Sequence, residues 1–346
     1  MRKSLTYDDI QLVPKYSNIS SRNDISLHTN LSKRYKLQNP IVASPMDTVC
    51  EYDMAYKMFL LGGVGCIHRF NDFEEQSKIV KKTHEVIYTQ FNKGRRDIWN
   101  GDVPIMAAIG VSEGDKKRAI ELIKAGCNVL LIDVAHGHHK NVKKMLEWCK
   151  RNLNDKVDII AGNIATKEAA QELESWGVDG LRVGIGGGSL CTTRLKTGFG
   201  IPNVSCLEDI VSVAKTPVMA DGGIRSSGDI SKALALGASQ VMLGLLIAGT
   251  EEAPGQIIET TNGLYKRYRG SASLETKVTH GQKTRNVEGE STTIPYKGGV
   301  KFIVNGLIDG VKSALSYGGA SNLQDFNPSY VVVTNSGLNE AKPHLL

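Results

Sequence analysis

Short apolar runs rich in β-branched residues recur along most of the chain, and glycine or polar residues bound each of them. Near-continuous apolar runs of this length are typical of parallel strands that are buried on both faces. The pattern predicts eight strands, at residues 40–46, 63–68, 104–111, 129–135, 157–163, 180–186, 217–223 and 240–246.

Amphipathic segments lie between these runs. In residues 114–125, apolar side chains recur at helical spacing, and Lys, Arg and Glu occupy the other positions. The same order of a polar start, an apolar stripe, a glycine and a strand recurs at 166–178 and 227–237. Thr166 and Ser227 are the predicted N-caps of these two helices, because a hydroxyl there can accept a hydrogen bond from the first turn.

Eight strands that alternate with helices predict a (β/α)8 barrel, known as a TIM barrel. A doubly wound open sheet is the alternative, but it would usually have fewer units. We expect a single domain over residues 1–346, with the barrel core at about 40–246. Two long stretches do not fit the bare barrel: a glycine-rich loop after the sixth strand, 186–204, and a polar, turn-rich flap after the eighth, about 265–300. Long loops at the C-terminal ends of barrel strands are where we expect the functional site.

Composition and charge exclude several classes of protein. The 346 residues are 41% hydrophobic and 23% charged, which excludes general disorder. The net charge of +6 is mild and no long basic run occurs, so a small anionic ligand is favoured over nucleic acid. No apolar run is long enough to span a membrane, and the start of the chain lacks the apolar segment of a signal peptide. The six cysteines form no CxxC pair, so we expect free thiols and a cytoplasmic location.

Cys191 is the strongest candidate nucleophile. It lies in a loop whose Gly184, Gly186, Gly187 and Gly188 can bring the backbone close to a ligand. A reactive thiolate needs access and stabilising dipoles, whereas the other five cysteines lie in strand or helix patterns or at a helix start. The alternative is that Cys191 is a small buried loop residue. A dinucleotide-binding interpretation of the glycines is weak, because no helix is predicted directly after them.

Glycines also end the seventh and eighth predicted strands, as Gly222 and Gly223 in ADGGIRSSGD and Gly244 in MLGLL. In many barrels these two loops bind a phosphate through backbone amides and a helix N-terminus. The alternative is that the glycines only form a tight turn.

Three charged residues at loop positions are open to more than one interpretation. Asp133, at the end of the fourth predicted strand, can hydrogen-bond a sugar hydroxyl or a base. Arg285 and Glu288 lie in the flap, and they are either site residues or solvated surface charges. The histidines of AHGHH have poor spacing for a structural zinc site.

Eight motifs resemble those of the family of inosine monophosphate dehydrogenase and GMP reductase, over about residues 5–343. They are LTYDDIQLVP, PMDTV, DVAHGH, AGNIAT, VGIGGGSLCTTR, ADGGIRSSGDI, GTEEAPG and YRGSAS. The resemblance implies a (β/α)8 barrel that is usually a homotetramer, a purine nucleotide and a nicotinamide cofactor as ligands, and a covalent bond from the loop cysteine to purine C2. Dehydrogenases of the family usually carry a regulatory insertion between the second helix and the third strand, and too few residues lie there in this chain to contain it.

The flap favours the reductase chemistry of the family, in which GMP is reductively deaminated to IMP and ammonia with NADPH through a covalent Cys191 thioimidate. The dehydrogenases hydrolyse this intermediate with water activated by an Arg-Tyr pair, and residues 274–297 contain no Arg-Tyr dipeptide. LKTGFGIP and RNVEGE also resemble the reductases. The alternatives are an IMP dehydrogenase without the regulatory module, which would convert IMP to XMP with NAD, and a catalytically inactive purine nucleotide sensor. Gly187, Asn203 and Leu245 depart from the usual family residues and motivate the sensor.

The resemblance also implies roles for individual residues. The catalytic residues are Cys191, Thr193 and Glu288. The nucleotide contacts are Met46, Ser189, Asp221, Gly222, Gly223, Gly244, Tyr268, Gly270, Arg285 and Gly289. The cofactor contacts, for NADPH or alternatively NADH or NAD, are Ser21, Arg22, Arg69, Asp133, Val134, Ala135 and Asn163. A potassium ion is implied on the backbone carbonyls of Gly184, Gly186 and Cys191.

Overall fold

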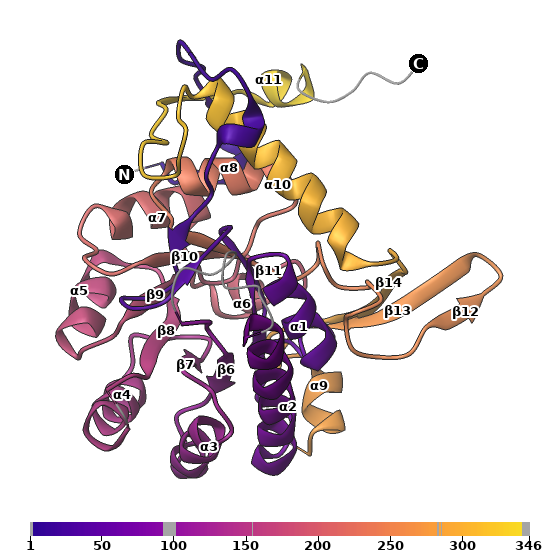
Figure 1. The fold of residues 1–346 in the computed structure, drawn as a ribbon. Helices are drawn as coiled ribbons and strands as arrows, with labels where there is room; N and C mark the ends of the chain where they lie inside the picture. Colours follow the sequence, from indigo (N-terminus) through magenta and orange to yellow (C-terminus); the bar gives the residue numbers. More distant parts are fainter. Residues whose placement is uncertain (1–2, 93–101, 154, 282–283, 285, 341–346) are drawn as a thin grey trace.

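Eight parallel strands close into a barrel in the order β10-β11-β4-β5-β6-β7-β8-β9, and helices surround it (Figure 1). The structure is a computed structural model, and it describes residues 3–92, 102–153, 155–281, 284 and 286–340. The barrel strands are β4 (Ile41–Ala43), β5 (Val64–Ile67), β6 (Met106–Ile109), β7 (Val129–Asp133), β8 (Asp158–Ile164), β9 (Gly180–Val183), β10 (Val218–Asp221) and β11 (Gln240–Leu243). All eight coincide with predicted runs, so the predicted (β/α)8 fold is confirmed.

The barrel strands are buried on both faces. Leu130, Leu131 and Ile132 of β7 have no exposed surface, because one face of the strand fills the barrel interior and the other lies beneath the helices. Leu131 is the register partner of Ile160 on β8, and all neighbouring barrel strands run parallel. The C-terminal ends of the strands therefore meet at one rim.

In the described part of the chain, eight helices of nine or more residues cover the barrel. They are α1 (Tyr52–Leu60), α2 (Phe73–Asn92), α3 (Glu113–Lys124), α4 (Lys140–Asn152), α5 (Lys167–Ser175), α7 (Asn203–Val211), α8 (Ser227–Ala235) and α10 (Val300–Tyr317). The last of these, α10, packs against α8 and touches α1, so it completes the ring. The predicted core at 40–246 thus contains all eight strands but not the eighth helix, which follows the flap in sequence. Residues 93–105 connect α2 to β6, and 93–101 of them lie outside the described part.

One of the two predicted helix caps is correct. Thr166 precedes α5, and its side chain accepts a hydrogen bond from the backbone amide of Ala169. The prediction of Ser227 as the cap of α8 was wrong, because Ser226 has the extended backbone of an N-cap and its hydroxyl accepts from the amide of Asp229. The Asp229 carboxylate in turn accepts a hydrogen bond at 2.9 Å from the backbone amide of Arg225, the residue before Ser226.

The two long stretches outside the bare barrel also contain short regular elements. Residues 186–204 include the short helix α6 (Thr193–Thr197). The flap region holds an antiparallel sheet that projects from the barrel (Figure 1) and a helix between its second and third strands. These elements are β12 (Ile258–Thr260), β13 (Gly263–Arg269), α9 (Leu274–Thr279) and β14 (Ser291–Pro295). The strand pattern of β13 was hidden because its two buried side chains are Lys266 and Tyr268.

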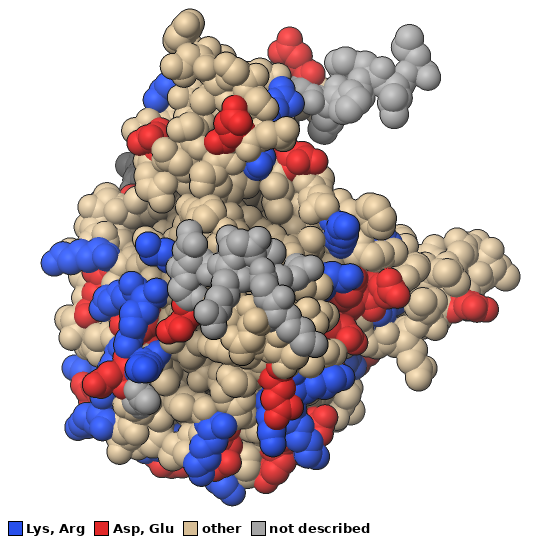
Figure 2. Space-filling model, viewed as in Figure 1, with Lys and Arg blue, Asp and Glu red and all other residues tan. Residues whose placement is uncertain are grey.

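The two ends of the chain meet on one side of the barrel. Strand β1 (Ile10–Leu12) pairs antiparallel with β15 (Tyr330–Val332). The remaining elements are η1 (Tyr7–Asp9), η2 (Arg22–Asp24), the paired strands β2 (Thr29–Asn30) and β3 (Lys36–Leu37), and α11 (Asn335–Glu340). On the face drawn in Figure 2, basic and acidic side chains lie interspersed. Among the described residues, no helix combines the length and apolar character needed to cross a membrane.

Candidate active site

A cavity of about 580 Å³ lies at the rim formed by the C-terminal ends of the barrel strands, with the Cys191 loop and the flap as walls. Nineteen of the predicted site residues line it: Met46, Arg69, Asp133, Val134, Ala135, Asn163, Gly184, Gly186, Ser189, Cys191, Thr193, Asp221, Gly222, Gly223, Gly244, Tyr268, Gly270, Glu288 and Gly289. The structure therefore brings together residues that follow the C-terminal ends of seven barrel strands and residues of the flap.

Three predicted site residues are not among those that line the cavity. Ser21 and Arg22 lie at η2, which packs against α10, and Arg22 is exposed. Within one copy of the chain they are therefore not placed to contact a ligand in the cavity. Arg285 lies outside the described residues.

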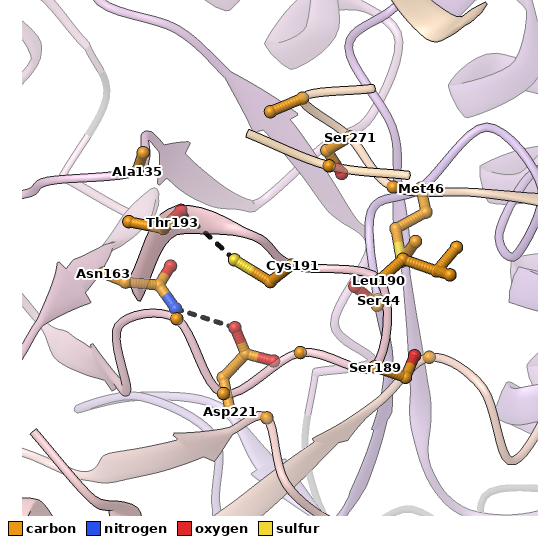
Figure 3. Close-up of a pocket in the computed structure, with 18 of the residues that line it drawn as sticks. Ser44, Met46, Ala135, Asn163, Ser189, Leu190, Cys191, Thr193, Asp221 and Ser271 are labelled. Carbon is orange, nitrogen blue, oxygen red and sulfur yellow. Dashed lines mark hydrogen bonds between the residues drawn. The ribbon is translucent and has the colours of Figure 1, made fainter. Parts of the chain in front are cut away.

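Cys191, Thr193 and Glu288 form a continuous hydrogen-bonded chain. The Cys191 thiol donates to Thr193 Oγ1 at 3.2 Å, as Figure 3 shows, and Thr193 Oγ1 donates to Glu288 Oε2 at 2.7 Å. Backbone bonds hold the two sides together, since the Thr192 amide donates to the Glu288 carbonyl at 2.9 Å. A proton can pass along this chain from the thiol to the carboxylate, which is how enzymes activate a weak nucleophile.

Cys191 is also the accessible thiol among the six cysteines. It is half-buried, whereas the other five are buried. Burial raises the pKa of the Cys127, Cys149 and Cys206 thiols to about 12, and it raises the pKa of Cys50 and Cys66 as well. These five thiols stay protonated near neutral pH, so they are poor nucleophiles.

Glycines and two hydroxyls that line the cavity form a cradle for an anionic group. Ser189 Oγ and Tyr268 OH lie 3.0 Å apart. Gly222 has φ of 89° and sits so close to the Cys191 loop that a Cβ there would lie 2.8 Å from the carbonyl carbon of Gly187. Burial raises the pKa of Tyr268, so its hydroxyl stays available as a donor. Hydroxyl and backbone donors around a small space are the usual composition of a phosphate site.

A row of charged groups crosses the floor of the cavity. Arg182 on β9 is buried and donates to Asp133 at 2.5 Å and to Asp221 at 3.0 Å. Asn163 donates from Nδ2 to Asp221 Oδ2 at 2.7 Å (Figure 3) and to the Gly184 carbonyl at 2.7 Å. One guanidinium thus holds both carboxylates, with Asp221 toward the cradle and Asp133 toward Arg69. Arg69 Nη2 donates to the Asp133 carbonyl at 3.0 Å.

Sequence reasoning missed Arg182, Arg225 and Lys277, which also line the cavity. A signal for Arg182 was present, because GLRV is an apolar strand with one cation, and a charge is seldom fully buried unless it is paired. No comparable signal marked Arg225 or Lys277. Among the described residues, no group of three or more His, Cys, Asp and Glu side chains is arranged to hold a metal ion.

The model of the IMP dehydrogenase / GMP reductase domain matches residues 4–344. The chain belongs to this family. The predicted family resemblance is therefore confirmed.

Some of the relatives are named as IMP dehydrogenases and others as GMP reductases. The inosine-5'-monophosphate dehydrogenase of Cryptosporidium parvum is 38% identical over 388 aligned positions, which cover 99% of this chain and 95% of the relative. The GMP reductase of Leishmania major is 32% identical, with 99% of this chain and 97% of the relative covered. Among solved structures, a GMP reductase from Trypanosoma brucei in complex with guanosine 5'-monophosphate superposes with a TM-score of 0.92 at 30% identity, covering 100% of this chain and 98% of the other.

Proposed function

We propose that this family member is a GMP reductase that converts GMP to IMP and ammonia with NADPH. The observation that carries the proposal is the chain from Cys191 through Thr193 to Glu288. It offers a nucleophile together with a carboxylate that can hold a proton and return it, which is what the loss of a poor amine leaving group requires. The GMP reductases among the relatives and the GMP-bound structural neighbour support the same activity.

In the first half of the proposed reaction, the Cys191 thiol transfers its proton through Thr193 to Glu288, and the thiolate attacks C2 of the purine. The nucleotide would lie with its phosphate between Ser189 and Tyr268. Asp221 Oδ2 is already held by Asn163 and Arg182, so its other oxygen is available to a ribose hydroxyl. The carbon becomes tetrahedral with sulfur and nitrogen both bound.

In the second half, Glu288 returns the proton through Thr193 to the amine. The C2–N bond then breaks and ammonia departs, so that the purine remains bound to Cys191 as a thioimidate. The hydrogen that the thiol lost is the one that ammonia gains, so this step balances without another acid. The bond from C2 to sulfur breaks when C2 is reduced, and solvent protonates the released thiolate.

Residues on the Asp133 side of the cavity fit a nicotinamide cofactor. Arg69 Nε lies 3.5 Å from Asp133 Oδ2, and within the described residues this buried atom has no hydrogen-bond partner. An incoming polar group would satisfy it. We propose that Arg69, Asp133, Val134, Ala135 and Asn163 hold the cofactor, which supplies a hydride to C2 when bound.

We propose that a potassium ion supports the Cys191 loop, on the backbone carbonyls of Gly184, Gly186 and Cys191. Carbonyl oxygens are the ligands that hold this ion in other proteins. The Gly184 carbonyl already accepts the Asn163 amide, but a carbonyl oxygen has a second lone pair for a cation.

We also propose a cytoplasmic homotetramer. All six cysteines are free, as in reducing compartments. Ser21 and Arg22 do not line the cavity of their own copy, so they can act as cofactor contacts only toward a neighbouring copy. Tyr16 and Phe302 are apolar side chains with 91% and 81% of their surface exposed, which suits surfaces that are covered in an oligomer.

The identity with the Cryptosporidium relative favours IMP dehydrogenase as the second candidate function. One assay separates the two functions: GMP with NADPH in one cuvette and IMP with NAD in another, followed by the absorbance of the reduced cofactor. We expect NADPH oxidation with one ammonia per turnover, and no activity after Cys191→Ala. Formation of XMP and NADH would show that the protein is an IMP dehydrogenase and not a GMP reductase. GMP binding without turnover would favour the nucleotide sensor.

A further inference from the structure

Two lysines outside the predicted site bind consecutive carbonyls of the flap. Lys196 on α6 donates from Nζ to the Val287 carbonyl at 2.8 Å. Lys277 on α9 donates from Nζ to the Asn286 carbonyl at 2.7 Å. The residue that follows these two carbonyls is Glu288, the end of the proton-transfer chain. The segment just before Glu288 is therefore fixed by ammonium groups from two different helices.

The backbone of this segment needs such support. Asn286 has φ of 57°, and it is the non-glycine residue with a positive φ in the described part of the chain. This conformation is unfavourable for a residue with a side chain, although asparagine tolerates it better than most. It persists where surrounding contacts determine it. The two lysine bonds are contacts of that kind.

The helix α6 holds Glu288 at two points. Thr193 and Lys196 are three residues apart on this helix, so they lie on the same face. Thr193 contacts the Glu288 carboxylate, and Lys196 contacts the carbonyl of the preceding residue. On the other side, the Glu288 amide donates to the Ala272 carbonyl at 3.1 Å.

We propose that Lys196, assisted by Lys277, is a positioning residue that keeps Glu288 within reach of Thr193 and thereby sets the rate of amine loss. The inference rests on the proposed GMP reductase function. Neither ammonium group contacts the thiol or the hydroxyl of the chain in the structure, so both act through Glu288. Lys196 matters most, because its carbonyl partner is adjacent to Glu288 and its helix also carries Thr193.

The first test compares two partial reactions in Lys196→Met. Ammonia release from GMP uses Glu288 twice, to take the proton of the thiol and to return it to the amine, whereas hydride transfer from IMP to NADP uses it once, to take the proton of the thiol. We expect ammonia release to slow about tenfold or more, because a charge-assisted hydrogen bond is lost, with the KM for GMP changed less than about threefold. The hydride half-reaction should slow less, because it requires only the first of these two proton transfers. Lys196→Arg keeps a donor and should restore most of the rate, and Lys301→Met, an exposed lysine on α10, is the matched control.

The second test is a double-mutant cycle with Glu288→Gln. If Lys196 acts through Glu288, then Lys196→Met should have no further effect on ammonia release once Glu288 is glutamine. An equal loss in both backgrounds would overturn the proposal, as would equal slowing of both partial reactions or wild-type ammonia release by a folded Lys196→Met protein. The unmodified protein is assayed first, so that inactivity toward GMP with NADPH refutes the proposed function itself, whereas an active parent with an insensitive Lys196→Met refutes only the role of the lysines.

Discussion

Thr193 and Glu288 are 95 residues apart in the chain, yet the hydroxyl of one donates to the carboxylate of the other at 2.7 Å. Thr193→Val removes this link while keeping the shape of the side chain. We expect kcat for ammonia release to fall by ~10²–10⁴-fold, the usual contribution of a proton-transfer group, with little change in the KM for GMP. Thr193→Ser retains the hydroxyl and should retain most activity. A Thr193→Val protein with near-normal turnover would show that the proton takes another route.

The hydroxyls of Ser189 and Tyr268 predict where the nucleotide phosphate binds. Tyr268→Phe should raise the KM for GMP by about three- to tenfold, the cost of one hydrogen bond, and leave kcat nearly unchanged. Guanosine lacks the phosphate and serves as the control substrate, because its KM should not respond to the substitution. An equal effect on both substrates would place the phosphate elsewhere.

Arg182 is expected to be essential for stability as well as for the site. Replacing it with leucine leaves the carboxylates of Asp133 and Asp221 without their shared cation in a buried setting. We expect Arg182→Leu to lower the free energy of unfolding by about 3–5 kcal/mol in urea titrations. The surface pair of Lys116 and Glu113 gives the comparison, since Lys116→Met should cost less than about 1 kcal/mol. Similar losses for the two variants would contradict the assignment of Arg182 as a buried bridge.

Acid stability should depend on Glu275, which lies in the flap helix α9. The hydrogen bond from Arg267 lowers the pKa of this carboxyl from 4.5 to about 2. Between these pH values the native state binds fewer protons at this site than the unfolded chain, so stability falls as the pH is lowered through the window. Urea midpoints measured across this range should therefore decline less steeply for Glu275→Gln than for the parent protein. Parallel declines would mean that Glu275 and Arg267 are not paired in solution.

The potassium proposal is tested by ion replacement. Exchange of K⁺ for tetramethylammonium at constant ionic strength should lower kcat severalfold, because a larger cation cannot fit between the loop carbonyls. Restoring K⁺ should recover the rate. Activity that is indifferent to the cation would show that the hydrogen bonds of Asn163 and the loop backbone are sufficient to order Cys191.

The predictable parts of the fold are those in which the buried side chains are apolar, so that the sequence itself indicates which positions are buried. The runs around Leu131 and Ile160 are apolar because both faces of a barrel strand are buried, and no tertiary knowledge was needed to find them. Strand β13 was not recognised, because its inward positions hold Lys266, whose ammonium bonds the Thr250 and Ala253 carbonyls, and Tyr268. A polar side chain that finds buried partners far along the chain leaves no local signature.

The same reasoning applies to the candidate site. Cys191 and Glu288 could be named from motifs that resemble a family, but their connection through Thr193 depends on how the flap folds back over α6. The contact of Lys277 could not be predicted from the sequence, because its partner, the Asn286 carbonyl, is a backbone group that every residue possesses. Sequence patterns identify the chemical groups of a site more readily than the contacts that orient them.

The pairing of β1 with β15 has a consequence for how this protein is made. Ile10 emerges from the ribosome long before its register partner Val332. Domains form as units during synthesis, and a strand without its partner offers an open edge. The growing chain thus carries β1 as an unpaired edge until β15 has been made, and a truncation before residue 330 would leave that edge exposed in the finished product.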